Sequence, residues 1–420
     1  MTRPRPTLRA LSWPDRLVFA LGAVGWLHFI DATTWHAQPN SGAFERTLQF
    51  VLAIVSGPLL AAGYLRLGTK SRGLATFLAG IPLLATGITI HIVGTVKDGF
   101  GSGDGTGIAI AFAGLGLVLT GLLKLETAIP RWRWRLATLP LAAPLLLWVL
   151  LPATMVVFVT HAPRYEITAQ DLGAEYEEVS FQTSDGLTLR GWYVPSKNGA
   201  AVAVLHGSSG ARIRPLLHIR MLQAHGYGVL AYDTRGHGES DGTTNALGWN
   251  AEKDASAALD YLESRDDVEP GRVGLLGLSM GAEIALEMAT NDHSAAAIVA
   301  DGAGVRSSRE MKDVSFGWSK FVSYPVAAGM TWGTALFRLE MPPAALSGYI
   351  DDIQTPVFYI ASDQIAEERE LNETWSKLTT SEHQLWKADA SHTGGLKTQP
   401  KEYESRVMAW FDAHLLEKAR

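Results

Sequence analysis

Apolar residues form long stretches in the first 160 residues of the chain and only short ones after that. Five long stretches follow one another, at about 17 to 36, 47 to 67, 74 to 96, 106 to 126 and 136 to 160. Each is close to the roughly 20 residues that a helix needs to cross the hydrocarbon core of a bilayer. The pattern predicts an α-helical transmembrane bundle of about five spans over residues 1–160, in contact with membrane lipids. Buried helices of a large soluble core are the alternative.

The loops between these stretches differ in positive charge. Three of them, counting the N-terminal segment, carry four, three and four Lys or Arg, whereas the two loops that alternate with them carry one each. Lys and Arg in short loops are retained on the cytoplasmic side of a membrane. Five spans with this charge pattern predict an integral, multi-pass membrane protein whose C-terminal part is extracytoplasmic. The glycines Gly114, Gly116 and Gly121 within the fourth stretch predict close packing between helices.

The C-terminal part has the pattern of an α/β domain. After a linker at 161–175, two strand-like runs flank the turn Ser184-Asp185-Gly186, which predicts a hairpin. Most of the later apolar runs are separated by segments long enough for a helix, so we expect a mostly parallel sheet with crossover helices over 176–420. These runs lie at 201–205, 227–232, 272–278, 295–300, 356–361 and 383–387.

Charge and cysteine content exclude several functions. Residues 1–160 carry 13 Lys and Arg against 6 Asp and Glu, so the remaining 23 and 36 give residues 161–420 a net charge of −13. An acidic domain without a basic run offers no electrostatic footprint for nucleic acid. The chain has no cysteine, which excludes disulfides, thiolate metal sites and cysteine nucleophiles.

Ser279 is the candidate nucleophile. It stands in Gly277-Leu278-Ser279-Met280-Gly281, between an apolar strand and a segment of helical pattern. Glycines on both sides permit a tight turn, and the N-terminus of the helix directs its N–H groups towards a developing oxyanion. A second backbone donor is available at His206-Gly207-Ser208, which follows the strand at 201–205, so the N–H groups of Ser208 and Met280 are predicted to form an oxyanion hole.

Together with Asp233-Thr-Arg-Gly-His-Gly-Glu-Ser240, these motifs resemble the α/β-hydrolase superfamily of serine hydrolases over about 176–418. The resemblance implies a scaffolding role for Arg235 and His237. It also implies an acid after the penultimate strand and a histidine after the last one, which are Asp363 and His392. His392 is then the general base and Asp363 the carboxylate that orients it. Asp301, at the end of the strand 295–300, is the alternative acid.

The resemblance implies a cap in the aromatic-rich insertion at about 302–350, which suits hydrophobic substrates. The expected function is a membrane-anchored serine hydrolase that cleaves a small-molecule or lipid-like ester or amide, without a metal or cofactor. Esterase or lipase-like activity is favoured. A serine peptidase and an acyltransferase would need the same triad. A different class is a membrane transport or sensing protein with a non-catalytic, hydrolase-like binding domain.

Overall fold

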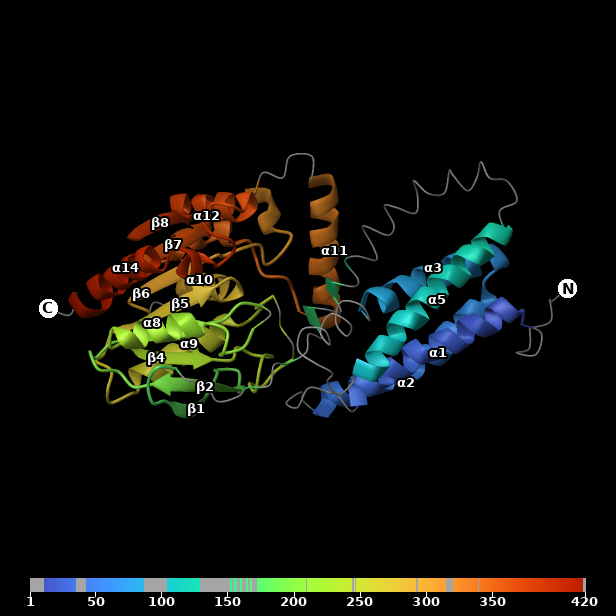
Figure 1. The fold of residues 1–420 in the computed structure, drawn as a ribbon, viewed down its shortest axis with the longest axis horizontal. Coiled ribbons are helices and arrows are strands. Elements are labelled where there is room, and N and C mark those ends of the chain that lie inside the picture. Colours follow the sequence, from blue (N-terminus) through green and yellow to red (C-terminus); the bar gives the residue numbers. More distant parts are fainter. Residues whose placement is uncertain are drawn as a thin grey trace. The chain divides into compact units, whose positions relative to one another are not determined.

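The computed structural model describes residues 11–34, 43–86, 104–128 and, with short gaps, 152–417. The chain divides into two compact units, Met1–Phe158 and Val159–Arg420 (Figure 1). This division falls beside the boundary that the change in apolar pattern indicates. The first unit is helical where it is described, and the second contains every strand of the described residues.

The described N-terminal unit is built from four helices. They are α1 (Trp13–Thr34), α2 (Ala43–Arg66), α3 (Thr69–Thr86) and α5 (Asp104–Ala128). No helix in the described ranges combines the length and the apolar character that crossing a membrane requires. The prediction of a transmembrane bundle in an integral multi-pass protein is therefore wrong, and the extracytoplasmic placement that depended on it is withdrawn. The fifth predicted span, 136–160, lies largely outside the described residues.

These helices also contain residues that are unusual in an apolar span. Prolines lie inside α2 and α3, at Pro58 and Pro82. Charged side chains also fall within the helices, and Asp15 of α1 is buried in the unit. It accepts hydrogen bonds from the Ser12 hydroxyl, the Tyr64 hydroxyl at 2.8 Å and the Lys124 ammonium. Burial alone would raise the pKa of Asp15, but these hydrogen bonds lower it to about 2. Polar and charged groups near the ends of the apolar stretches thus take part in the packing of this unit.

Glycines allow close helix packing in this unit, as the sequence predicted. A Cβ atom on Gly114 would lie 2.2 Å from the backbone nitrogen of Leu84 in α3, and one on Gly121 would lie 2.4 Å from that of Phe77. Gly116 faces α1 instead, where its Cβ would lie 2.7 Å from the Leu21 side chain. Several large apolar side chains of the unit remain exposed, so packing between the described helices uses only part of the apolar pattern: Leu27, Leu59, Leu60, Phe112, Leu119 and Leu123.

The C-terminal unit contains an eight-stranded mixed sheet in the order β1-β2-β4-β3-β5-β6-β7-β8. The predicted hairpin is present, with β1 (Glu177–Gln182) antiparallel to β2 (Thr188–Val194). The six strands β3 to β8 are parallel to one another, as expected for crossover connections. They are β3 (Ala201–Leu205), β4 (Gly228–Tyr232), β5 (Val273–Leu278), β6 (Ala297–Asp301), β7 (Val357–Ser362) and β8 (His383–Ala388).

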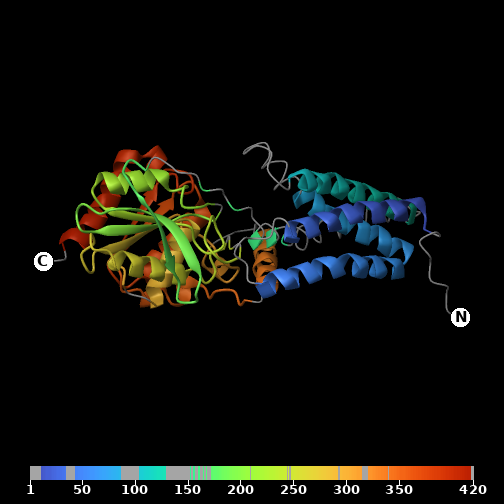
Figure 2. The ribbon, with the colours of Figure 1, turned by 90° about the horizontal axis from the view of Figure 1, so that it is seen from below.

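Helices cover both faces of the sheet (Figure 2). One core contains side chains from α9 (Glu252–Glu263), α10 (Met280–Asn291) and α12 (Ala366–Leu378). The other contains side chains from α8 (Leu216–Ala224) and α14 (Pro400–Phe411). The central strands β3 to β7 are buried along their whole length, because they are covered on both faces. Chemistry is therefore confined to the loops at the carboxyl ends of the strands.

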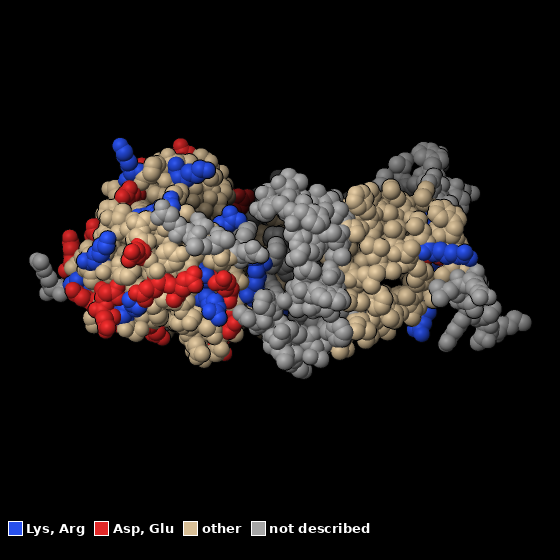
Figure 3. Space-filling model, turned by 60° about the horizontal axis from the view of Figure 1, so that its bottom comes forward, with Lys and Arg blue, Asp and Glu red and all other residues tan. Residues whose placement is uncertain are grey.

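The insertion after β6 and the segment after β8 complete the described part of this unit. The insertion after β6 contains the 3-10 turns η4 (Glu310–Asp313), η6 (Leu346–Gly348) and η7 (Ile350–Asp352) and the helix α11 (Lys320–Arg338). Arg306 anchors it, since this buried guanidinium pairs with Glu310 within the insertion and with Glu287 of α10. After β8 come α13 (Gly395–Thr398), α14 and the π-helical turn η8 (Asp412–Glu417). Acidic side chains are frequent on the face of this unit seen in Figure 3, in line with its negative charge.

Candidate active site

Ser279 lies at the sharp turn between β5 and α10. Its φ angle is +55°, a value that non-glycine residues seldom adopt. The backbone N–H of Ser279 donates to the carbonyl of Asp301 at 2.8 Å, which holds this conformation against the end of β6. The flanking glycines are required sterically. A Cβ on Gly277 would lie 2.3 Å from the carbonyl oxygen of Gly281, and one on Gly281 would lie 2.5 Å from that of Leu205.

Ser279 and His392 are hydrogen-bonded. The distance from Ser279 Oγ to His392 Nε2 is 2.9 Å. His392 belongs to the loop between β8 and α13, so residues 113 positions apart in the sequence meet at one edge of the sheet. Both side chains are accessible, since Ser279 is half-buried and the His392 side chain is 44% exposed. This is the contact that a serine nucleophile and its general base need.

The carboxylate that contacts His392 is Glu368, which the sequence analysis missed. His392 Nδ1 lies 2.6 Å from Glu368 Oε2 on α12. The other carboxylate oxygen, Oε1, accepts the backbone N–H of Ser362 at 2.7 Å. Only 5% of the Glu368 side chain is exposed. The hydrogen bond with Glu368 raises the pKa of His392 above its usual value, while burial acts in the opposite direction.

Neither carboxylate considered from the sequence bonds to His392. Asp363 follows β7 as expected, but its side chain is 53% exposed and pairs with Arg369 at 3.1 Å. Asp301 accepts a hydrogen bond from the Tyr403 hydroxyl at 2.8 Å and interacts with His392 through charge alone. Burial raises the pKa of Asp301 to about 7, although the bond from Tyr403 opposes this. The orienting contact expected of Asp363 is thus made by Glu368.

The sequence did contain a signal for Glu368. Buried positions of α12 recur at Glu368, Leu371, Asn372 and Trp375, with helical spacing. A glutamate on the buried stripe of a helix is unusual, because its charge must be compensated by partners. Asn372 of the same helix ties α12 to the segment after β6. Its amide donates at 2.8 Å to the carbonyl of Ala303 and at 2.8 Å to that of Glu368.

The predicted oxyanion donors stand on either side of Ser279. Met280 is the first residue of α10, and the first N–H groups of a helix have no acceptor within it. Ser208 lies in the loop after β3, where a Cβ on the preceding Gly207 would lie 3.3 Å from Ser279 Cβ. The carbonyl of Ser208 interacts with His237 Nε2 at 3.2 Å, which steadies this loop.

The histidines of the two flanking motifs are scaffold residues. His206 Nε2 accepts the backbone N–H of Thr234 at 3.2 Å, and burial lowers its pKa to about 4. Burial likewise lowers the pKa of His237 to about 3, so both rings are neutral at pH 7. Arg235 binds Asp254 and Asp185, which fixes the loop after β4. The scaffolding role that the resemblance implied for Arg235 and His237 agrees with these contacts.

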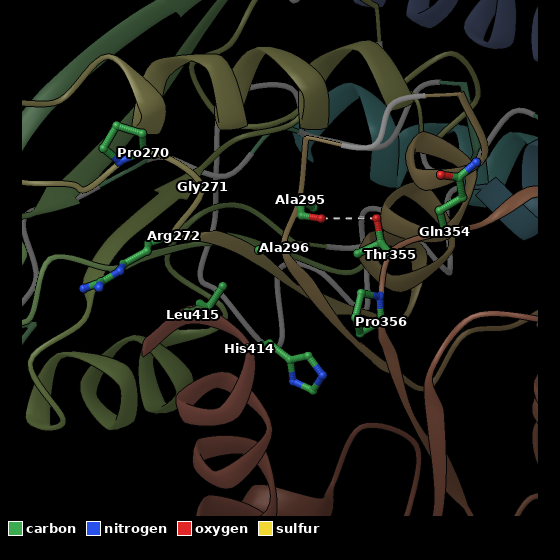
Figure 4. A pocket seen from close by; sticks show the side chains of 10 residues that line it. All are labelled: Pro270, Gly271, Arg272, Ala295, Ala296, Gln354, Thr355, Pro356, His414 and Leu415. Carbon is green, nitrogen blue, oxygen red and sulfur yellow. Dashed lines mark hydrogen bonds between the residues drawn. The ribbon is translucent and has the colours of Figure 1, made fainter. Parts of the chain in front are cut away.

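A hollow lies at the edge of the sheet opposite to Ser279 and His392 (Figure 4). It has a volume of about 480 Å³. Its walls come from the segments that precede β5, β6 and β7 and from η8: Pro270, Gly271, Arg272, Ala295, Ala296, Gln354, Thr355, Pro356, His414 and Leu415. Since Ser279 and His392 follow the carboxyl ends of their strands, this hollow is separate from the candidate active site.

Comparison with known proteins places the C-terminal unit in a family. The model of the X-Pro dipeptidyl-peptidase (S15) family matches residues 159–414, which is more than half of the chain. The chain belongs to this family. The match, together with the sheet order and the turn at Ser279, confirms the predicted α/β-hydrolase fold for this unit.

Individual relatives of this S15-family chain match over shorter segments. The uncharacterized protein Rv2307c of Mycobacterium tuberculosis is 35% identical over 125 residues, which are 29% of this chain and 44% of that protein. The α/β-hydrolase domain-containing protein WAV2 of Arabidopsis thaliana is 31% identical over 132 residues, 30% of this chain and 42% of that protein. The chain thus spans less than half the length of these relatives. The solved structure of the esterase Pf2001 from Pyrococcus furiosus has 25% identity and a TM-score of 0.49, covering 60% of this chain and 99% of that one.

The position of the His392 ring in this S15-family chain depends on the absence of a side chain at Gly302. Gly302 has a φ angle of +72°, and a Cβ on it would lie 2.7 Å from Thr393 Cγ2 and 3.1 Å from His392 Cε1. We expect Gly302→Ala to displace the imidazole and to lower kcat by about a hundredfold, the usual consequence of a 1 Å error in a reacting group.

Gly186→Ala is the matched control for this substitution. Gly186 has a similar φ angle of +84°, but a Cβ there would meet nothing within 4 Å. The Gly186→Ala variant therefore measures the effect of the backbone strain alone. Equal activities of the two variants, measured at equal folded fractions, would contradict the steric role of Gly302.

Proposed function

We propose that the C-terminal unit is a serine hydrolase that cleaves esters or amides through an acyl-enzyme on Ser279. His392 is the general base, and Glu368 is the acid that orients it. One observation carries this proposal: the continuous hydrogen-bonded chain from Ser279 Oγ through the two nitrogens of His392 to Glu368, with distances of 2.9 and 2.6 Å.

The geometry supports a two-step acyl transfer. His392 Nε2 accepts the proton as Ser279 Oγ attacks the carbonyl carbon, and the N–H groups of Ser208 and Met280 stabilise the oxyanion. Glu368 holds Nδ1–H and stabilises the imidazolium that forms. The leaving group takes the proton from His392 as its bond to carbon breaks. Water then repeats the attack on the acyl-enzyme, with His392 again as base, and releases the acid and free Ser279.

Carboxylic esters of small or lipid-like acids are the first proposed substrate class. Their carbonyl needs no contact beyond the serine, the base and the oxyanion donors. The insertion of residues 302–350 carries exposed aromatic side chains such as Phe321, Tyr324 and Trp332, and we propose that they bind the acyl group. The second candidate is the release of Xaa-Pro dipeptides, favoured by the family match over residues 159–414.

Turnover assays separate the two classes. The purified chain would be assayed with p-nitrophenyl esters of increasing acyl length and with Xaa-Pro p-nitroanilides. Hydrolysis of the esters alone supports an esterase, and hydrolysis of the anilides with a free N-terminus supports a dipeptidyl-peptidase. Absence of turnover and of active-serine labelling would leave only a non-catalytic domain and would overturn the proposal.

The pH dependence of turnover follows from the environment of His392. Only the neutral imidazole accepts a proton, so activity is lost as the pH falls through the pKa of His392. The Glu368 hydrogen bond raises this pKa above the ordinary histidine value of about 6.5. We therefore expect the acid limb of kcat/KM to have its midpoint above 6.5, since this parameter reports the free enzyme. A midpoint below the usual histidine value, measured with a soluble ester, would contradict the contact between Glu368 and His392.

A further inference from the structure

Ser362 joins the segment leading to helix α12, which carries Glu368, to the loop that carries His392. It is the last residue of β7 and is 3% exposed. Its backbone N–H donates to Glu368 Oε1 at 2.7 Å. Its hydroxyl donates to the carbonyl of Ala390 at 2.6 Å, two residues before His392. Ser362 therefore contacts both the carboxylate of Glu368 and the start of the loop that carries His392.

The hydroxyl of Ser362 is fully engaged in this junction. Besides donating to Ala390, its oxygen accepts the backbone N–H of Gln364 at 3.2 Å. This second bond fixes the segment that leads from β7 into α12, where Glu368 lies. A buried hydroxyl with both a donor and an acceptor partner has one orientation, because any rotation leaves a polar group unpaired.

We propose that Ser362 is a positioning residue for the catalytic pair, and that its hydroxyl sets the distance between Glu368 and the imidazole of His392. This inference rests on the proposed function, since it concerns how the general base is held. The side chain does not touch Ser279 or a substrate. It acts by fixing the loop that carries His392 relative to the helix that carries Glu368.

Three acidic groups surround His392 and would respond differently to a loosened loop. Glu368 of α12 bonds to it directly, whereas Asp301 of β6 and Glu283 of α10 act on it only through charge. Small displacements weaken a hydrogen bond steeply and a longer-range charge interaction little. Loss of the Ser362 hydroxyl is therefore expected to lower the pKa of His392 towards its ordinary value.

The test is the rate of labelling by a fluorophosphonate probe as a function of pH, measured on the full chain. In Ser362→Ala we expect the second-order labelling rate constant to fall about tenfold or more, because a misplaced base loses its alignment with the nucleophile. We also expect the midpoint of the acid limb to move to lower pH. The backbone N–H that binds Glu368 is retained in this variant.

Thr379→Val is the matched control. The Thr379 hydroxyl is also buried and also has two partners, the carbonyl of Trp375 at 2.9 Å and the Tyr359 hydroxyl at 2.7 Å. It lies at the far end of α12, so its loss is expected to lower Tm without moving the pH profile. A merely structural Ser362 would give the same behaviour in both variants.

The outcomes are distinct. A slower rate with a shifted acid limb in Ser362→Ala alone supports the positioning role. An unshifted limb overturns it, as does unfolding of Ser362→Ala under conditions where Thr379→Val stays folded. If the wild-type chain is not labelled at all, the proposed function itself fails. Labelling of the wild type with identical profiles for both variants removes only the inference about Ser362.

Discussion

Replacing Ser279 by alanine is expected to lower kcat/KM by about a million-fold, the usual loss when the nucleophile of a triad is removed. The reason is that the Ser279 hydroxyl is the group hydrogen-bonded to His392 Nε2, at 2.9 Å. The fold should be retained, because the substitution removes one oxygen from a half-buried turn and leaves the bond from the Ser279 N–H to Asp301 in place. Steady-state kinetics and the thermal midpoint would be measured together.

Ser208→Ala is the control for this experiment. Ser208 is proposed to act through its backbone N–H, which the substitution preserves, so its activity should stay near that of the wild type. An active Ser279→Ala enzyme would contradict the assignment of the nucleophile. An inactive Ser208→Ala enzyme would give the Ser208 side chain a role that the structure does not assign to it.

Glu368→Gln is expected to lower kcat by about four orders of magnitude, as when the orienting acid of a triad is replaced by its amide. Glutamine can accept the Ser362 N–H with its oxygen, but its amide nitrogen then faces His392 Nδ1 at the site of the 2.6 Å bond. Two donors cannot bond to each other, so the imidazole changes tautomer and Nε2 no longer accepts the Ser279 proton. Kinetics with an activated ester would measure the loss.

The matched substitutions test the correction of the acid. Asp363→Asn should change kcat by less than about twofold, because a half-exposed ion pair such as that with Arg369 contributes little. Asp301→Asn should cost more than this but far less than Glu368→Gln, since Asp301 holds Tyr403 and not the imidazole. Loss of activity in Asp363→Asn alone would return the acid to the position that the sequence first indicated.

The sheet of the C-terminal unit was predictable because its strands are short, apolar and bounded by turns. The run at 201–205 coincides with β3, and the run at 272–278 differs from β5 by one residue. Strands buried on both faces need apolar residues throughout, so their limits are visible in the sequence. The turn at Ser279 was visible for a related reason, since only glycine fits beside this residue in such a tight turn.

The carboxylate that contacts His392 was not predictable from its place after a strand. Asp363 has the expected position, but the chain turns so that Glu368, one turn into α12, enters the site instead. The direction of that turn depends on tertiary contacts, among them the bonds of Ser362 to Gln364 and Ala390. Hydrophobic periodicity describes which face of α12 is buried, but not which buried side chain meets the imidazole.

In the N-terminal unit the apolar pattern led to a wrong prediction. Stretches of suitable length led to a membrane prediction, whereas the described helices lack the combination of length and apolar character that a span requires. Gly114 and Gly121 bring α5 close to the backbone of α3. The charged group at Asp15 is placed in a cluster with Lys124 and Arg72, which no local pattern indicates because its members lie on three helices.

The proposed function requires Ser279 to be a nucleophile that His392 activates. The most direct test is to react the folded chain with a fluorophosphonate at neutral pH and to locate the adduct by peptide mapping and mass spectrometry. We expect a single adduct on Ser279, absent from Ser279→Ala and formed far more slowly in His392→Ala. An unlabelled wild-type chain, or an adduct on another serine such as Ser208, would contradict the account.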